Sequence, residues 1–122
     1  MGKNQSPEHD AQVAIVDLIK SMAPELMFTA TVGGVRLSMN QAKRMKAAGY
    51  LRGIPDLLFF EPRGEFMGLA IELKARKGGR VSADQRSALN KLTERGWRAE
   101  VAHGYGEALS VLRSYFEELA EA

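Results

Sequence analysis

Two apolar runs separated by a short turn restrict the fold of this chain more than any other feature of its sequence. The first run extends from Asp56 to Glu61, and the second extends from Gly68 to Lys74. Between them, Pro62-Arg63-Gly64 has the residue types that turn a chain back on itself. The spacing predicts two neighbouring antiparallel strands. The unbroken apolar stretch of the first run also predicts a strand that is covered on both faces.

The second run ends in two charged residues, which a buried strand tolerates only if each ion finds a partner. Because side chains alternate along a strand, Glu72 and Lys74 share one face with the small Ala70. Pro55 restricts the backbone immediately before Asp56. Counting the same number of residues from the turn along each strand places Asp56 near the level of Glu72 and Lys74. Two carboxylates that converge at one end of a sheet repel each other, and a divalent cation such as Mg²⁺ or Mn²⁺ is the usual remedy. The nearby lysine could stabilise charge on a substrate phosphate.

The rest of the chain alternates between helical and extended patterns. Ser6-Pro7 is typical of a helix start, and Ser82 followed by Gln85 forms a capping-box pattern. The remaining expected elements are a helix from Pro7 to about Met22, a strand from Met27 to Val32 that Gly33-Gly34 turns into a short partner from Val35 to Leu37, a helix from Gln41 to Ala48, a helix from Ser82 to about Arg95, a strand from Trp97 to Ala102 and a helix from about Gly106 to Leu119. This order predicts an α/β domain in which a mixed β-sheet is flanked by helices.

The length of 122 residues and the hydrophobic content of 45% suit one globular domain that spans residues 1–122. The chain has no cysteine, which excludes disulfide frameworks and thiolate metal sites. No apolar run approaches the roughly 20 residues of a membrane span, and the N-terminal residues lack the apolar core of a signal peptide. We therefore expect a cytoplasmic protein without membrane contact.

The net charge is only +2, but the positive charges are clustered. One acid-free group lies between residues 36 and 52, and a second begins at Lys74. Such clusters form either a phosphate-binding surface or a solvated face that binds nothing, and charge alone does not separate these alternatives. The candidate phosphate-contacting residues are Arg36, Lys43, Arg44, Lys46, Arg52, Arg76, Lys77 and Arg80.

Gly53-Ile54-Pro55-Asp56, followed on the next predicted strand by Ile71-Glu72-Leu73-Lys74, resembles the signature of the PD-(D/E)XK nucleases. The further matching stretches are Glu8 to Gln12, Gly68 to Lys74, Gly78-Gly79-Arg80-Val81-Ser82 and Gln85. Taken together, the chain from about Glu8 to Phe116 resembles the VRR-NUC family of virus-type replication-repair nucleases, as a stand-alone domain of phage or bacterial type. The resemblance implies a restriction-endonuclease-like core. It also implies a location in the bacterial cytoplasm, or in the bacterial host cell if the protein is phage-encoded.

This resemblance implies an endonuclease that uses Mg²⁺ or Mn²⁺ to hydrolyse DNA phosphodiester bonds. Asp56 and Glu72 would bind the metal together with the backbone carbonyl of Leu73, and Lys74 would orient or help deprotonate the attacking water. The family also places an acid at the position of Glu8 beside the metal, and Glu8 could reach the ion through a water molecule. The helix macrodipole alone, however, already favours an acid in a first helical turn. Gln85 would join the catalytic site, but its capping-box partnership with Ser82 explains it equally well.

Two other functions stay open on the sequence: a catalytically inactive DNA-binding or scaffolding module with the nuclease fold, and a small-molecule phosphohydrolase. The presence of Asp56, Glu72 and Lys74 together favours an active enzyme over the first. The chain lacks the glycine-rich cradle between a strand and a helix that the second would need. Because one small domain offers one metal site and no sequence-reading motif, we expect a homodimer that acts on branched DNA such as four-way junctions, in replication, recombination or repair. No organic cofactor is expected.

Overall fold

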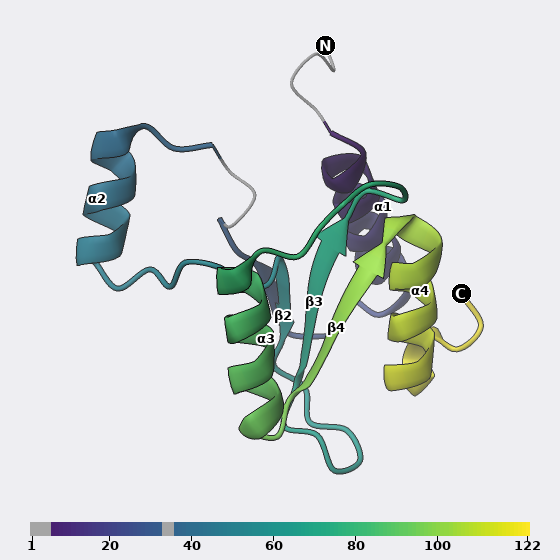
Figure 1. Cartoon of the computed structure of the whole chain (residues 1–122). Helices are drawn as coiled ribbons and strands as arrows, with labels where there is room; N and C mark the ends of the chain where they lie inside the picture. The colour runs from purple at the N-terminus through teal and green to yellow at the C-terminus, as the bar shows by residue number, and fades with distance from the viewer. Residues whose placement is uncertain (1–5, 33–35) are drawn as a thin grey trace.

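The computed structural model describes residues 6–32 and 36–122, and it contains a mixed sheet between helices (Figure 1). The expected α/β architecture is therefore confirmed. In chain order, the helices and strands are α1 (Pro7–Met22), β1 (Phe28–Ala30), α2 (Met39–Ala47), β2 (Leu57–Phe59), β3 (Leu69–Lys74), α3 (Ala83–Glu94), β4 (Arg98–His103), α4 (Gly104–Tyr115) and a short 3₁₀-helix η1 (Glu117–Leu119).

The four strands lie in the order β1-β2-β3-β4. The pairs β1–β2 and β2–β3 are antiparallel, while β3 and β4 are parallel, because the chain crosses over the sheet through α3 between them. The antiparallel register pairs Leu57 with Ile71 and Phe59 with Leu69. The expected turn between the two apolar runs is therefore confirmed, and it fixes which residues meet at the far end of the two strands.

The starts of α1 and α3 follow the predicted capping chemistry, whereas α2 begins at Met39, two residues before the predicted Gln41. The Ser6 hydroxyl accepts a hydrogen bond from the backbone N–H of His9 at 3.2 Å, and Pro7 occupies the first helical position of α1. Ser38 opens α2 and Ser82 opens α3, each in a complete capping box with the glutamine three residues later. The capping box at Ser38, which the sequence interpretation did not identify, explains the earlier start of α2.

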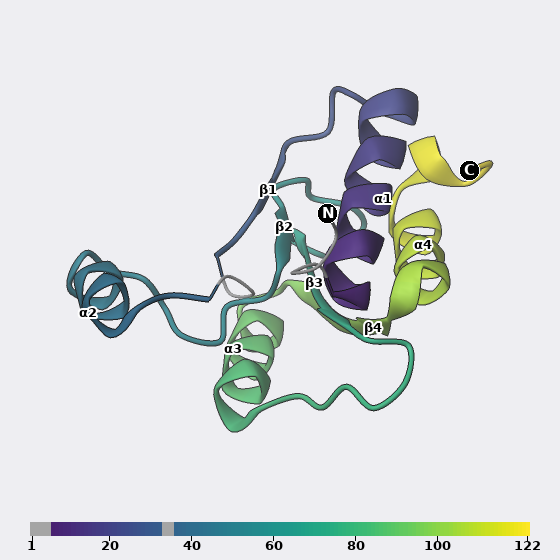
Figure 2. The same ribbon diagram turned by 90° about the horizontal axis from the view of Figure 1, so that it is seen from above.

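The sheet divides the molecule into layers (Figure 2). Helices α1 and α4 cover one face, and α3 lies on the other face, where it contacts β4. The core lies between the sheet and the pair α1–α4, since the inward residues of β2 and β3 meet those of both helices there. The largest fully buried side chains of this core are Ile15, Ile19, Leu57, Phe59, Leu69, Ile71, Leu112, Phe116 and Leu119.

Other predictions of local structure are wrong in detail. The expected hairpin from Met27 to Leu37 does not form: β1 pairs with β2 instead, and Arg36 and Leu37 are not in a strand. The residues of the expected turn, together with Val35, lie outside the described residues. Residues 28–30 pair with all three residues of β2, and backbone bonds from Thr31 N–H to the Asp56 carbonyl and from Phe60 N–H to the Met27 carbonyl extend this pairing at both ends.

The first apolar run is also shorter and more exposed than expected. Only Leu57–Phe59 forms β2, and the next residue, Phe60, is 43% exposed rather than covered. The last helix begins at Gly104 rather than at about Gly106 and ends at Tyr115, where the chain continues into η1.

Helix α2 stands away from the sheet on extended segments (Figures 1 and 2). We refer to residues 36–52 as the arm. None of the residues of α2 is buried within the chain. In the described parts of the chain, no helix has the length and apolar character needed to cross a membrane.

Candidate functional site

The C-terminal end of β3 brings Asp56, Glu72 and Lys74 together. Asp56 directly precedes β2, and the pairing of Leu57 with Ile71 places Asp56 one step further along, beside Glu72. One carboxylate oxygen of Asp56, Oδ2, accepts a hydrogen bond from the backbone N–H of Leu73 at 2.7 Å. The aspartate is therefore held against β3 by the backbone between the other two charged residues.

The approach to Asp56 depends on a glycine. Gly53 has a φ of +87°, and a Cβ atom there would fall 2.5 Å from the backbone carbonyl carbon of Asp84 and 2.8 Å from the backbone nitrogen of Gln85. Any other residue would push the chain away from the start of α3. Gly53 and the buried Pro55 therefore lead the chain under the N-terminal end of α3 and into β2 at Asp56.

Gln85 connects the acid and the base of this cluster. Its Nε2 donates to Glu72 Oε2 at 3.0 Å, and its Oε1 accepts from Lys74 Nζ at 2.9 Å. The same Oε1 accepts from the backbone N–H of Ser82 at 2.8 Å, which is the capping-box bond. Lys74 Nζ lies 3.5 Å from Glu72 Oε2. The capping role and the site placement of Gln85 are thus compatible, because one amide serves both.

Glu72 is the buried charged residue of this cluster, with a side chain only 4% exposed. Burial, followed by repulsion from the Asp56 carboxylate, raises the pKa of Glu72 to about 8, although Lys74 acts in the opposite direction. Burial also raises the pKa of Asp56, against the effects of the Leu73 N–H and of Lys74. In the metal-free protein, the two carboxyl groups therefore hold a proton near neutral pH that separated acids would release.

One oxygen of Glu72, Oε1, is buried and has no hydrogen-bond partner among the described residues. An orphaned carboxylate oxygen beside a second carboxylate fits a divalent cation, because the cation would satisfy the oxygen and remove the repulsion. Among residues 6–32 and 36–122, no group of three or more His, Cys, Asp or Glu side chains gathers. Such a site would therefore use two carboxylates, completed by a backbone carbonyl, water and substrate oxygens, as Mg²⁺ often does.

Glu8 lies near this cluster without joining it. The residue is half-buried in the first turn of α1, and its charge contributes to the raised pKa of Asp56. No bond from Glu8 to Asp56, Glu72 or Lys74 is present. A contact between Glu8 and a metal through water therefore stays a prediction.

The candidate phosphate-contacting residues fall into two exposed groups. Arg36, Lys43, Arg44, Lys46 and Arg52 lie on the arm, and Arg76, Lys77 and Arg80 lie in the segment that leaves β3 after Lys74. Arg52 forms an ion pair with Asp84 of α3, with Nε 3.0 Å from Oδ2. The two groups thus come from different parts of the chain, and Arg52 is the arm cation that lines the cavity beside the site.

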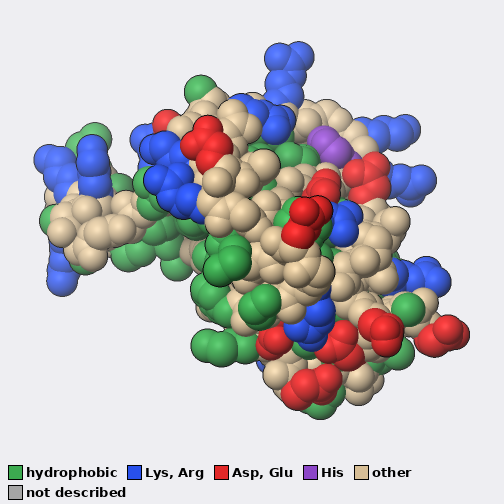
Figure 3. All heavy atoms as spheres, turned by 90° about the horizontal axis from the view of Figure 1, so that it is seen from below, with side chains coloured by type: hydrophobic (Ala, Val, Ile, Leu, Met, Phe, Trp, Pro, Cys, Tyr) green, Lys and Arg blue, Asp and Glu red, His purple; other side chains and the backbone are tan. Residues whose placement is uncertain are grey.

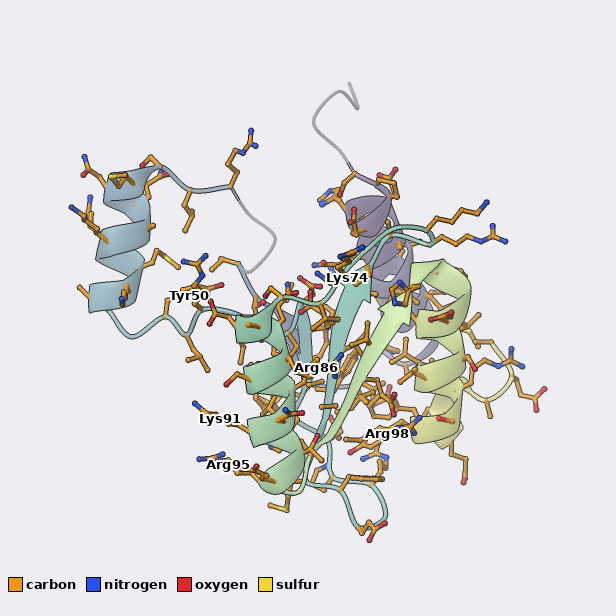
Figure 4. All side chains as sticks on the ribbon, viewed as in Figure 1. Tyr50, Lys74, Arg86, Lys91, Arg95 and Arg98 are labelled. Atoms are coloured by element: carbon orange, nitrogen blue, oxygen red, sulfur yellow. The ribbon has the colours of Figure 1, made fainter. Side chains whose placement is uncertain are left out.

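The sequence interpretation missed cations on α3. Lys91 and Arg95 project from α3 on the side of the arm, while Arg86 lies on the side of the sheet (Figure 4). The interpretation looked for acid-free runs, and these residues alternate with Asp84 and Glu94. The spacing of four between Lys91 and Arg95 on a helix was the available signal.

A cavity of about 290 Å³ adjoins the site. Its lining includes Asp56 and Gln85 together with Tyr50, Arg52 and Asp84. Tyr50 was not singled out from the sequence, because nothing in its neighbours indicates that the arm returns to the site at this residue. The cavity gives the charged cluster access to solvent.

The raised pKa values predict how stability depends on pH without metal. Between about 4.5 and about 8, the folded protein keeps a proton on Glu72 that the unfolded chain releases, so stability falls as the pH rises through this window. One proton sets a limit of about 1.4 kcal/mol per pH unit. Denaturant unfolding in EDTA at several pH values should show this fall, and Glu72→Gln should flatten it. An equally steep curve for Glu72→Gln would contradict the assignment.

Comparisons with known proteins agree with this fold and these motifs. A family model described as the VRR-NUC domain matches residues 35–106, more than half of the chain. The match contains Asp56, Glu72, Lys74 and Gln85 and begins after Glu8. A solved structure described as a "VRR_NUC domain protein" superimposes with a TM-score of 0.75 and 23% identity, covering 93% of this chain and 91% of that chain. No curated protein matches the sequence. The chain belongs to the VRR-NUC family of nuclease-type domains.

Proposed function

We propose that this protein is a metal-dependent endonuclease that hydrolyses DNA phosphodiester bonds. The observation that carries the proposal is the buried pair Asp56–Glu72, which has one orphaned carboxylate oxygen and lies beside Lys74. A VRR-NUC domain is a nuclease-type domain, and nucleases of this family generally use divalent metals. The identity of the metal, Mg²⁺ or Mn²⁺, and the DNA structure belong to the proposal.

The proposed roles follow from the positions of the residues. Asp56, Glu72 and the carbonyl of Leu73 would hold the ion, which when bound lowers the pKa of water and polarises the phosphate. Lys74 holds its ammonium next to Glu72 and would stabilise the charge that develops on the phosphate. Gln85 is a positioning residue, because it bonds both Glu72 and Lys74 and is itself fixed by the cap of α3.

The rival function is a DNA-binding or scaffolding module that kept this fold and lost catalysis. Such a module has no need for a buried, unsatisfied carboxylate, which costs free energy in the metal-free protein. Here the carboxylates, the lysine and the glutamine that connects them are all in place. Because a binding module gains nothing from this free-energy cost, the buried carboxylate favours a catalytic function over the rival module.

Cleavage of a panel of labelled DNA structures tests the proposal. Linear, nicked, flapped, forked and four-way-junction DNA should each be incubated with Mg²⁺, with Mn²⁺ and with EDTA. We expect metal-dependent products from the branched substrates and none in EDTA. Binding without cleavage of any substrate in either metal would favour the rival module instead.

The basic residues of the arm are expected to contact DNA phosphates. Replacing Lys43, Arg44 and Lys46 together by alanine should weaken binding to all sequences and flatten the salt dependence of the binding constant. The expected change in the logarithmic slope is roughly 0.9 for each phosphate that the variant no longer neutralises. Lys20→Ala/Arg113→Ala removes exposed cations from α1 and α4, on the opposite face of the sheet, and serves as the control. An unchanged slope in the triple variant would mean that the arm is a solvated face.

We further propose that the working form is a homodimer with branched DNA as its substrate. One site cuts one strand at a time, and two copies related by a two-fold axis would cut two strands of a junction symmetrically. Phosphate contacts position a protein without reading sequence, so selectivity would come from DNA shape. Light scattering should give about twice the chain mass of 13.4 kDa, and paired symmetric nicks should appear across a junction. A monomer that cuts linear duplex at one fixed sequence would contradict both parts.

A further inference from the structure

We propose that the trough between the arm and α3 binds unpaired nucleobases of the DNA substrate, next to the site that cuts the backbone. This inference rests on the proposed function, because it names a feature of the substrate of the same site. It does not concern the metal, so binding measurements without metal can test it separately.

The trough is a cavity of about 550 Å³ whose lining is mostly apolar. Leu37, Ala42 and Leu51 line it from the arm, and Ala88 lines it from α3. Leu51 is 53% exposed, although an isolated large apolar side chain in a connecting segment gains nothing from contact with water. The trough therefore offers an apolar surface that the described part of the chain leaves open to a ligand.

Cations stand on both sides of this apolar surface. Lys46 and Arg52 line the trough from the arm, and Lys91 lines it from α3. Asp84 also lines it and is paired with Arg52. Figure 3, which views the molecule from below, shows blue side chains on the projecting arm and on the neighbouring part of the body, with green side chains between them. An anionic ligand with apolar faces complements this arrangement.

The trough and the site cavity share a boundary. Tyr50, Arg52 and Asp84 line both, and the site cavity is also lined by Asp56 and Gln85. Figure 4 shows Tyr50 between α2 and the N-terminal end of α3, where the two cavities meet. A strand whose phosphate lies at the carboxylate pair would therefore pass Tyr50 and Arg52 and continue into the trough.

Unpaired nucleotides fit this surface better than a double helix does. A duplex buries the faces of its bases and presents phosphates outward, so it would contact the cations and leave the apolar lining unused. Unpaired bases expose their faces, and an aromatic side chain such as Tyr50 stacks on any base while nearby cations hold the backbone. A protein ligand of this trough would have to be both acidic and apolar. If the trough bound such a protein instead of DNA, this chain would show no preference for DNA with exposed bases.

Abasic DNA separates contact with bases from contact with phosphates. Two fluorescein-labelled duplexes, one with a single-stranded thymidine tail and one with an abasic tail of equal length, should be titrated with the protein in EDTA. The wild type is expected to bind the thymidine tail at least about fivefold more tightly. Tyr50→Ala and Leu51→Ala should each reduce this preference to within about twofold, with circular dichroism to check folding. Lys91→Ala should weaken both tails equally, and Lys20→Ala on α1 should change neither.

Equal affinity of the wild type for the two tails would overturn the proposal and leave the trough to a protein ligand. A preference that survives in both Tyr50→Ala and Leu51→Ala would overturn the location. The proposed nuclease activity can fail separately. Preference for the thymidine tail without any cleavage in Mg²⁺ or Mn²⁺ would support base binding in the trough and contradict the nuclease activity. Cleavage of branched DNA without any preference for the thymidine tail would support the nuclease activity and contradict base binding in the trough.

Discussion

Replacing Glu72 or Asp56 by alanine is expected to abolish DNA cleavage. Each substitution removes one of the two carboxylates that converge at the end of β3, and the remaining one cannot hold a divalent ion in the same way. Loss of the ion removes several kcal/mol of transition-state stabilisation, which corresponds to a rate reduction of roughly a thousandfold or more. Initial rates on a branched substrate in Mg²⁺ measure this effect.

Folding of these variants has to be checked with isosteric partners, because Asp56→Ala also leaves the N–H of Leu73 without its acceptor. Glu72→Gln and Asp56→Asn keep the side-chain shape. At pH 8 in EDTA, Glu72→Gln should melt at or above the wild-type temperature, since a neutral amide avoids the cost of a buried carboxylate. Asp17→Ala removes an exposed carboxylate of α1 and should cut normally. Full activity in either Asp56→Ala or Glu72→Ala would contradict the site.

Lys74→Ala should lower the cleavage rate by roughly a hundredfold to a thousandfold while metal binding persists. The ammonium lies beside Glu72 and Gln85 and carries no metal-binding atom, so its main effect is expected in the transition state. Lys74→Arg should not restore activity, because a planar guanidinium does not replace a compact ammonium between these two partners. Cleavage rates at saturating Mg²⁺, with calorimetry of metal binding in parallel, measure both parts.

The outcome that would contradict this role is a near-wild-type rate for Lys74→Ala at saturating Mg²⁺. The lysine would then serve only as the structural partner of Glu72. Lys20→Ala, at an exposed position on α1, controls for the loss of a positive charge from the protein.

The arrangement of the sheet was predictable where the sequence pattern is local. Alternation along β3 predicted which side chains face the core, and the turn after Glu61 predicted the antiparallel partner. The position of β1 was not predictable in this way. Pairing Phe28–Ala30 with β2 joins residues about thirty positions apart, and the local pattern of glycines indicated a hairpin that the described residues do not form.

The site was predictable to a similar extent. Counting equal steps from the turn placed Asp56 beside Glu72, and one-residue alternation placed Lys74 on the same face. The hydrogen bonds from Gln85 to Glu72 and Lys74 were only partly predictable from the sequence. The capping box with Ser82 already explained Gln85 without any contact to the sheet. The trough depends on how the arm returns past α3, and no periodic pattern in residues 36–52 reports that three-dimensional path.

Calorimetric titration with Mn²⁺ tests the central claim most directly, because it examines the carboxylate pair without requiring the correct DNA substrate. At pH 7, the wild type is expected to bind the ion and release protons, since the metal displaces the proton that the raised pKa of Glu72, about 8, keeps on the pair. Comparing buffers with different ionisation enthalpies measures the release, and Glu72→Gln and Asp56→Ala should lose both binding and release. Unchanged affinity and proton release in both variants, or no binding to the wild type at millimolar Mn²⁺, would contradict a metal centre at Asp56 and Glu72.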